Sequence, residues 1–373
     1  MAVKLFVPKE LAVGERRVAL SPPVAIKLRA LGIDLLLETG AGLSAGFPDT
    51  AFPDLRPVTA SEGASVADAV FKVQAPLPAN VAHMRPGSVL IGLLNPYRNI
   101  EVVKALRDRR VSSFAMELVP RISRAQSMDA LSSQAAASGY KAALIAAEKL
   151  ARFFPMLTTA AGTIRPAKVL VVGAGVAGLQ AIATARRLGA MLEGYDVRAA
   201  AREQVESLGA KFVDTGVSAE GSGGYARELT AEEKQQQQEV LARHVTQADA
   251  VITTAAIPGR AAPRIVSQAM VEAMKPGSVI VDLAAESGGN CELTKPGEDV
   301  LHGTVLISGP LNLPSLLAEH ASDMYARNLL NFFAPLVKDG AISIDWNDEV
   351  YAKSVLTHDG EIKHEPTRKL AGG

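Results

Sequence analysis

With 373 residues, the chain is too long for one ordinary hydrophobic core and long enough for two domains. Hydrophobic residues make up 48% and charged residues 21%, with 39 basic against 39 acidic side chains, a globular balance that argues against nucleic acid as a partner. Cys291 stands alone and no apolar run reaches the roughly 18–20 residues that cross a bilayer, which excludes a disulfide framework and predicts a soluble chain in a reducing compartment.

Short apolar blocks alternate with helical patterns along the first third of the chain. The blocks are bounded by turn residues and lie at Lys4–Val7, Ile33–Glu38, Ala69–Val73, Ser88–Leu94 and Val111–Met116. Helical patterns at 23–31 and 100–110 separate some of them. Alternation of this kind predicts a parallel sheet with helices on its faces.

The middle of the chain predicts a connection to a second α/β unit. The stretch Leu131–Phe154 is rich in alanine and free of proline, which indicates one long helix joining two domains. Residues 156–168 suit an arm or hairpin at a domain boundary. A second alternating unit runs from Lys168 to about Leu306, and a helix near Pro314–Val337 is expected to lead back to the first domain.

A glycine-rich turn opens the second unit and carries the strongest motif of the sequence. Lys168–Val172 predicts a strand, and a GxGxxG turn, a helical run and a second strand at Met191–Tyr195 follow it. Gly173 would make the tight turn, Gly175 would let backbone approach a pyrophosphate, and Gly178 would allow close packing of helix on strand. The free N–H groups at the start of the helix would bind phosphate.

Asp196 ends the second strand, eighteen residues after Gly178. A carboxylate in this position would bind the ribose 2′-hydroxyl and repel a 2′-phosphate, which predicts NAD(H) over NADP(H). Arg198 keeps the alternative open, because a guanidinium two residues further on could neutralise a phosphate and favour NADP(H).

The remaining segments complete a two-domain architecture. The Gly-rich stretch Ser218–Glu228 predicts a mobile loop, and Gln235–Gln238 predicts a polar helix face. Residues 341–364 are typical of hairpin strands with a turn at Asp359-Gly360. We predict an α/β fold of two Rossmann-like domains with parallel sheets, joined by long helices: an N-terminal domain of residues 1–130 completed by 310–373, and an NAD-binding domain of residues 131–309.

Several longer stretches identify a family. RISRAQSMDALSSQ, TAAGT, GAGVAGLQAIATARRLGA, EQVESLGAKF, GGYARE, TTAAIPGRAAP and VDLAAESGGNC together resemble the NAD-binding component of proton-translocating nicotinamide nucleotide transhydrogenase. The matches run from about Pro8 to Asn331, and the residues beyond Asn331 resemble the family less clearly. Because no membrane span follows, the chain is similar to the version in which the alpha subunit is split and this component is a separate polypeptide.

The resemblance implies roles for two groups of residues. In the loop 121–129 it implies that Arg121, Gln126 and Asp129, with Ser132 nearby, take part in hydride transfer. The nicotinamide contacts that it implies in this loop are Arg121, Ile122, Ser123, Arg124 and Gln126. The cofactor contacts that it implies in the second unit are Gly173, Gly175, Val176, Gly178, Asp196, Val197, Arg198, Gly224, Tyr225, Gln237 and Ala256. Tyr225 would belong to a mobile lid, and no metal is expected.

The resemblance also implies partners. The family fold is a dimer of two-domain protomers, so a homodimer is expected. NAD(H) would bind in the cleft between the domains of this chain, and NADP(H) would bind to a partner, the beta component. A transmembrane proton-channel component would hold this cytoplasmic protein at the cytoplasmic face of the inner membrane.

Alanine dehydrogenase is the nearest sister family and the first rival interpretation. Its active site uses an N-terminal arginine, a lysine at a strand end and a histidine in the following strand. This chain keeps Arg17, but Gln74 stands where that lysine would be, and Leu94 or Asn95 stands where the histidine would be. Two of the three substrate-handling residues are therefore expected to be missing.

The loop 121–129 contains no His, Cys or Lys, and none of the six histidines lies in it or in the nucleotide motifs. Oxidation of an amine or alcohol needs a general base, whereas hydride transfer between two nicotinamides moves no proton at the reacting carbons. Other interpretations stay open: Asp129 as a helix N-cap, Arg124 as a surface charge, Tyr225 as a packing aromatic, and the whole chain as a non-catalytic NAD sensor.

Overall fold

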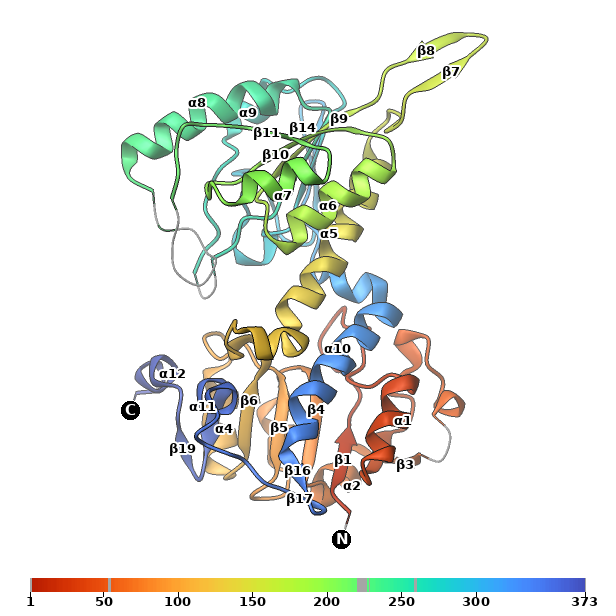
Figure 1. The fold of residues 1–373 in the computed structure, drawn as a ribbon, viewed down its shortest axis with the longest axis vertical. Helices are drawn as coiled ribbons and strands as arrows, with labels where there is room; N and C mark the ends of the chain where they lie inside the picture. The colour runs from red at the N-terminus through yellow and green to blue at the C-terminus, as the bar shows by residue number, and fades with distance from the viewer. Residues whose placement is uncertain (1, 53–54, 220–226, 228, 258–259, 373) are drawn as a thin grey trace. The chain divides into compact units, whose positions relative to one another are not determined.

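The computed structural model describes residues 2–52, 55–219, 227, 229–257 and 260–372. The chain divides into two compact units: unit 1 consists of Met1–Gln134 with Pro314–Gly373, and unit 2 consists of Ala135–Leu313. Each unit is built around one large β-sheet with helices on its faces (Figure 1).

Unit 1 contains an eight-stranded sheet in the order β19-β18-β6-β5-β4-β1-β2-β3. Its strands are β1 (Lys4–Val7), β2 (Asp34–Glu38), β3 (Arg56–Val58), β4 (Ala69–Gln74), β5 (Val89–Leu93), β6 (Ser112–Ala115), β18 (Val355–His358) and β19 (Glu361–Ile362). The six strands from β6 to β3 are parallel to their neighbours, and β18 and β19 add an antiparallel edge. The C-terminal segment therefore completes the first sheet.

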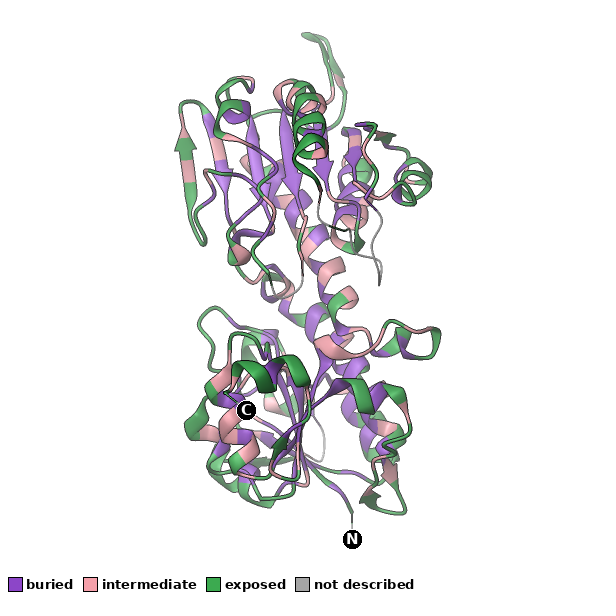
Figure 2. Cartoon of the chain, turned by 90° about the vertical axis from the view of Figure 1, so that its left-hand side faces the viewer, coloured by how far each residue is buried: buried purple, intermediate pink, exposed green. Residues whose placement is uncertain are grey.

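Helices cover both faces of this sheet, which explains why nearly every residue of its central strands β4 and β6 is buried (Figure 2). For example, α4 buries Val102, Val103 and Leu106, which recur at helical spacing. On the opposite face Phe71 of β4 meets Phe333 edge to face, with ring centroids 5.2 Å apart. The α-helices of unit 1 are α1 (Pro22–Ala30), α2 (Ala60–Val66), α3 (Pro78–Val81), α4 (Ile100–Asp108), α10 (Ala318–Phe333), α11 (Glu349–Ser354) and α12 (Glu365–Leu370).

Short elements connect these helices and strands. The 3-10 helices of unit 1 are η1 (Leu43–Ala45), η2 (Asp49–Ala51), η3 (Met116–Leu118), η4 (Ser123–Met128) and η8 (Ala334–Leu336). A small antiparallel pair joins β16 (Val337–Lys338) to β17 (Ala341–Ile342). The return from unit 2 passes through η7 (Leu313–Leu317), directly before α10.

Unit 2 contains a seven-stranded sheet in the order β11-β10-β9-β12-β13-β15-β14. Its strands are β9 (Lys168–Val172), β10 (Met191–Tyr195), β11 (Lys211–Phe212), β12 (Ala250–Thr253), β13 (Val279–Asp282), β14 (Asp299–His302) and β15 (Val305–Ser308). Only β14 runs antiparallel to its neighbour. Helix α5 (Ala130–Lys149) begins in unit 1 and continues into unit 2. The other helices of unit 2 are α6 (Val176–Arg187), α7 (Ala201–Ser207), α8 (Ala231–Gln247), α9 (Gln268–Glu272) and η6 (Ala285–Ser287).

The prediction of an α/β fold with two mostly parallel sheets is confirmed, and two elements differ from the expectation. The long helix α5 ends at Lys149 rather than at Phe154, because Leu150 and Phe154 turn into the core of unit 2 and Pro155 follows. The tail does form the hairpin of β18 and β19, but Glu349–Ser354 is helical because Asp348 caps it.

Residues 156–168 form the expected hairpin, with β7 (Leu157–Thr159) paired to β8 (Gly162–Ile164). The four glutamines Gln235–Gln238 lie on α8, as predicted. Most of the stretch Ser218–Glu228 lies outside the described residues. Among the described helices, none has the length and apolar character to cross a bilayer.

Helix α5 approaches α6 closely at Gly139, and substitution there should destabilise unit 2. A Cβ on Gly139 would lie 2.0 Å from the carbonyl oxygen of Ala177. We expect Gly139→Ala to cost about 1–3 kcal/mol through overpacking, measured as a lower Tm by circular dichroism. Glu148→Ala, at an exposed position on the same helix, is the control and should leave the Tm unchanged. A wild-type Tm for Gly139→Ala would contradict the close approach.

Candidate functional site

The glycine-rich turn between β9 and α6 has the backbone that its glycines predict. Gly173 has φ +98°, and a Cβ there would lie 2.6 Å from Thr254 Oγ1. A Cβ on Gly178 would lie 1.8 Å from the Gly173 carbonyl oxygen. Beyond its chain neighbours, no atom lies within 4 Å of a Cβ on Gly175, the N-cap of α6, and Val176 is 43% exposed. The N-terminus of α6 can therefore accept a phosphate.

Asp196 follows β10, and its carboxylate is surrounded by donors. Oδ2 accepts the Ala174 N–H at 2.7 Å, which ties the strand end to the glycine turn. The backbone N–H and Nε of Arg198 both donate to Oδ1 at 2.8 Å, and its Nη2 donates to Oδ2 at 2.7 Å. Val197 is half-buried, and its carbonyl accepts the Ala219 N–H at 2.9 Å. Arg198 neutralises Asp196 here, so the choice between NAD(H) and NADP(H) stays a prediction.

Two further predicted contacts lie near the ends of β10 and β12. Gln237 is buried on α8, and its Nε2 donates to the Tyr195 hydroxyl at 2.7 Å. Burial raises the pKa of Tyr195, although the hydrogen bond from Gln237 opposes this shift. Ala256 is exposed on the segment that follows β12. The side chain of Asn290 holds that segment, because its Oδ1 accepts the Ala255 N–H at 3.0 Å and its Nδ2 donates to the Ala255 carbonyl at 2.8 Å.

In unit 1 the loop 121–129 is folded as the 3-10 helix η4 and leads into α5. Ala125 and Met128 are 1% and 6% exposed and belong to the core of unit 1. The predicted contacts lie on the outside: Arg121, Ser123, Arg124 and Gln126 are exposed, and Ile122 is half-buried. Ala125 and Met128 therefore anchor the loop in the core, and its polar side chains are exposed to solvent.

Asp129 is the N-cap of α5, as the simpler interpretation proposed. Its Oδ1 accepts the Ser132 N–H at 2.8 Å, and its Oδ2 accepts the Ser132 hydroxyl at 2.6 Å. Both residues are half-buried. Arg124 is a partly exposed charge, but it forms a bidentate ion pair with Asp348, with Nη1 2.8 Å from Oδ2. The role of Asp129 in hydride transfer stays a prediction.

The structure thus assembles the predicted residues in two groups, one in each unit. The group in unit 1 contains Arg121–Asp129 and Ser132, and the group in unit 2 surrounds the turn between β9 and α6. Gly224 and Tyr225, the predicted lid residues, lie outside the described residues. Within the described residues of the chain, no cluster of His, Cys, Asp and Glu is placed to hold a metal ion.

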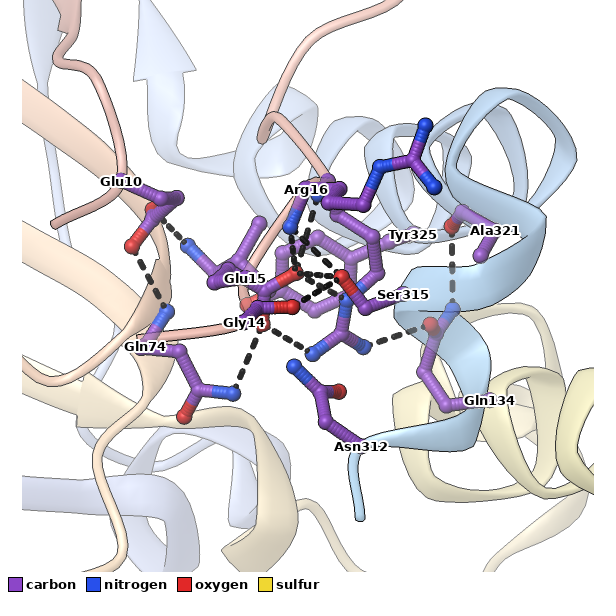
Figure 3. Close-up of polar contacts among 12 residues, drawn as sticks. Glu10, Gly14, Glu15, Arg16, Gln74, Gln134, Asn312, Ser315, Ala321 and Tyr325 are labelled. Atoms are coloured by element: carbon purple, nitrogen blue, oxygen red, sulfur yellow. Dashed lines mark hydrogen bonds and ion pairs between the residues drawn. The ribbon is translucent and has the colours of Figure 1, made fainter. Parts of the chain in front are cut away.

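Arg17, which the resemblance matches to an arginine of alanine dehydrogenases, is buried. Figure 3 labels its partners Glu15 and Gln134 within a polar network. Arg17 Nε and Nη2 donate to the Glu15 carboxylate at 2.8 and 2.6 Å, and Arg17 Nη1 donates to Gln134 Oε1 at 2.8 Å. Gln74 Nε2 donates to the same carboxylate at 2.9 Å, and the Ser315 hydroxyl does so at 3.2 Å. The guanidinium of Arg17 is therefore already paired with a carboxylate of the chain itself, that of Glu15.

A second buried ion pair lies at the end of β4. Lys72 Nζ is 3.0 Å from Glu10 Oε2, and Glu10 also accepts the Val73 N–H at 2.7 Å. Burial raises the pKa of Glu10, although Lys72 opposes the shift. Tyr325 donates to the Lys72 carbonyl at 2.7 Å and fixes the backbone of the same strand end. Lys72 and Gln74 are thus both held by acidic residues of the chain.

Comparison with known proteins places this geometry in a family. The models for the N-terminal and C-terminal domains of alanine dehydrogenase/PNT match residues 6–138 and 142–365. The chain belongs to the alanine dehydrogenase/PNT family. The family predicted from the sequence motifs is confirmed.

Three members of the alanine dehydrogenase/PNT family show where the chain lies within it. The first polypeptide of the NAD(P) transhydrogenase alpha subunit of Rhodospirillum rubrum is 48% identical, and the match covers 97% of this chain and 98% of that polypeptide. The crystal structure of transhydrogenase from Sinorhizobium meliloti has a TM-score of 0.88 and 45% identity, with 96% and 99% coverage. Alanine dehydrogenase of Bacillus subtilis is 33% identical, with 98% and 94% coverage.

Sequence reasoning missed two acidic residues of this family member. Glu15 lies two residues before Arg17, and a buried arginine needs a carboxylate partner, so this residue could have been found. Asp348 lies 224 residues from Arg124, and no local pattern indicates their pairing.

The ion pair of Glu15 with Arg17 should produce a measurable pH dependence of stability. Burial disfavours the charged form of Glu15, but hydrogen bonds from Arg17 and Gln74 outweigh this and lower its pKa from 4.5 to about 2. A lowered folded-state pKa stabilises the fold above the unfolded value of 4.5, and this stability is lost as the pH falls through about 2. The contribution at neutral pH is on the order of 3 kcal/mol.

We therefore expect Glu15→Gln to lower the free energy of unfolding at pH 7, with the difference from wild type shrinking between pH 4.5 and 2. Urea unfolding followed by tryptophan fluorescence suits the test, because the only tryptophan, Trp346, lies in unit 1. Glu101→Gln on the exposed surface of α4 is the matched control and should show little difference at any pH. A constant difference for Glu15→Gln across this pH range would contradict the assignment.

Proposed function

We propose that this chain is the NAD(H)-binding subunit of a proton-translocating nicotinamide nucleotide transhydrogenase. Similarity over nearly the full length to polypeptides of the transhydrogenase alpha subunit supports an oxidoreductase of this kind. In this proposal the chain passes hydride from NADH directly to NADP⁺ on a beta component, and a transmembrane component couples the reaction to proton movement. The chain acts as a homodimer that its partners hold at the cytoplasmic face of the inner membrane.

The proposal assigns the two groups of residues to two halves of one cofactor. The open N-terminus of α6 and the carboxylate of Asp196 suit the pyrophosphate and adenosine ribose of NAD(H). The exposed polar side chains Arg121 and Gln126 suit the carboxamide and ribose of the nicotinamide half. Bound NADH supplies the hydride. The domains involved are residues 1–130 with 310–373, and residues 131–309.

The observation that carries the proposal is the ion pair between the guanidinium of Arg17 and the Glu15 carboxylate. A self-contained amino-acid dehydrogenase needs a cation to bind the substrate carboxylate and a base to accept a proton. In this chain the guanidinium of Arg17 is already paired with the Glu15 carboxylate. Gln74 is uncharged and donates a hydrogen bond to the same carboxylate. The loop 121–129 contains no His, Cys or Lys, and its one carboxylate, Asp129, accepts hydrogen bonds from Ser132. Positioning a hydride donor beside a second nicotinamide needs neither group.

The first test compares two acceptors for NADH oxidation. We expect no turnover of pyruvate with ammonium by the purified chain, and turnover of NADP⁺ once an NADP(H)-binding beta component is added. Both reactions are followed by absorbance, with a thio- or acetyl-analogue of NADP⁺ to separate the two nicotinamide signals. Turnover of pyruvate would overturn the proposal in favour of alanine dehydrogenase chemistry. NADH binding without either reaction would favour a sensor.

A second test concerns the loop side chain Gln126. Because this residue is exposed and lies outside the core, Gln126→Ala should leave the fold intact and misplace the nicotinamide ring. We expect hydride transfer at saturating NADH to fall by roughly 10- to 100-fold, with a smaller change in Kd for NADH. Gln268→Ala, at an exposed position on α9, is the matched control. A change in NADH affinity alone would favour the sensor interpretation.

A further inference from the structure

The C-terminal segment of unit 1 holds the loop 121–129 from two sides. On one side the Ser127 carbonyl accepts hydrogen bonds from two amides of α10, Asn328 Nδ2 at 2.9 Å and Asn331 Nδ2 at 3.2 Å. Asn328 is 7% exposed, and its Oδ1 accepts the Ser133 hydroxyl at 2.7 Å, which links the loop to the start of α5. These contacts fix the backbone at the end of η4.

On the other side, Arg124 reaches Asp348 in front of α11. Both guanidinium Nη atoms contact the two carboxylate oxygens, and this bidentate geometry fixes the direction of the Arg124 side chain. Hydrogen bonding to Asp348 raises the pKa of Arg124, and the same bond lowers the pKa of the Asp348 carboxyl. Both groups are therefore charged at neutral pH.

Asp348 is itself held in place. Its Oδ1 accepts the Val350 N–H at 2.8 Å, so it is the N-cap of α11. Val350 is fully buried, and Tyr351 donates to the Phe332 carbonyl at 3.1 Å while its ring packs edge to face on Phe332, with centroids 5.1 Å apart. The carboxylate therefore reaches the loop from a short helix that is anchored in the core of unit 1.

An exposed ion pair of this kind adds little to global stability, since solvent screens it. Its physical effect is local, because it removes conformational freedom from the residue two positions before Gln126. In a reaction that depends on placing two rings, an error of about 1 Å can cost roughly 100-fold in rate. Six residues of the loop, Ser123–Met128, form the 3-10 helix η4, a geometry with weaker hydrogen bonds than an α-helix, so outside supports matter more.

We propose that Asp348 is a positioning residue for hydride transfer: from the cap of α11 it holds Arg124, and so the loop 121–129, in the geometry that presents Gln126 and Arg121 to the nicotinamide. The inference rests on the proposed function. It gives the C-terminal segment 345–354 a role in the reaction although none of its residues belongs to the predicted contacts.

The test is a double-mutant cycle with Asp348→Asn, Arg124→Gln and the double variant, measured as hydride transfer from NADH to NADP⁺ with the beta component present. Asparagine keeps an oxygen for the Val350 N–H but loses the charge, so α11 should persist. We expect Asp348→Asn to lower kcat by about tenfold with little change in Kd for NADH. The double variant should be no slower than Arg124→Gln alone, because Asp348 acts through Arg124.

Glu365→Gln is the matched control, since Glu365 lies on α12 of the same C-terminal segment and pairs with Lys369 across the exposed surface in the contacts described. Its kcat should equal that of wild type. Trp346 fluorescence, two residues from Asp348, shows whether the segment stays folded in each variant. High salt should lower the wild-type kcat toward that of Asp348→Asn and leave the variant unchanged, which loss of folding alone would not produce.

Each outcome separates the inference from the proposed function. An active wild type with an unchanged Asp348→Asn variant overturns the inference and leaves the proposed function in place. Additive losses in the double variant also overturn it, because the two residues would then act independently. A wild type that transfers no hydride with the beta component overturns the proposed function and, with it, this inference.

Discussion

The buried guanidinium of Arg17 is the constraint around which unit 1 is organised. A charge at 4% exposure is tolerated only with a carboxylate and further acceptors, because its desolvation otherwise costs several kcal/mol. Glu15 supplies the carboxylate and Gln134 supplies the third acceptor, while Ser315 contacts Glu15 from the segment that returns from unit 2. One ion pair therefore connects the N-terminal segment to the beginnings of two long helices. The same pairing that stabilises this arrangement removes the cation that a substrate carboxylate would need.

The predicted nucleotide site also contains a carboxylate that is paired within the chain, because Asp196 forms an ion pair with Arg198. A carboxylate accepts about four hydrogen bonds, and four donors already surround Asp196: the N–H groups of Ala174 and Arg198 and two nitrogens of the Arg198 side chain. The backbone donors belong to the turn and cannot leave without unfolding it, whereas the guanidinium is a flexible side chain. A ribose hydroxyl that bonds to Asp196 therefore takes the place of the Arg198 side chain. Under the proposed function Arg198 would then move within the site when nucleotide binds.

The sequence predicted the elements of the fold that depend on local patterns. The strands Lys4–Val7, Lys168–Val172 and Met191–Tyr195 have the bounds that their apolar runs indicate, since a buried parallel strand is an apolar run between turn residues. The glycine turn follows from backbone geometry, which only glycine satisfies at Gly173 and Gly178.

Local sequence patterns could not predict the contacts between segments that are distant in the sequence. The segment Glu349–Ser354 resembles a strand in sequence. It forms a helix because Asp348 caps it and because the Tyr351 ring packs on Phe332. The exposed polar side chains of the loop 121–129 could be named from the sequence. The contacts of Asp348 with Arg124, and of Asn328 and Asn331 with the Ser127 carbonyl, could not, because they join segments about two hundred residues apart. Under the proposed function the chain contributes position rather than a proton acceptor, and such supports would matter because the free energy of catalysis would then reside in the placement of the rings. The return of the C-terminal segment to unit 1 brings Asp348, Asn328 and Asn331 into contact with this loop.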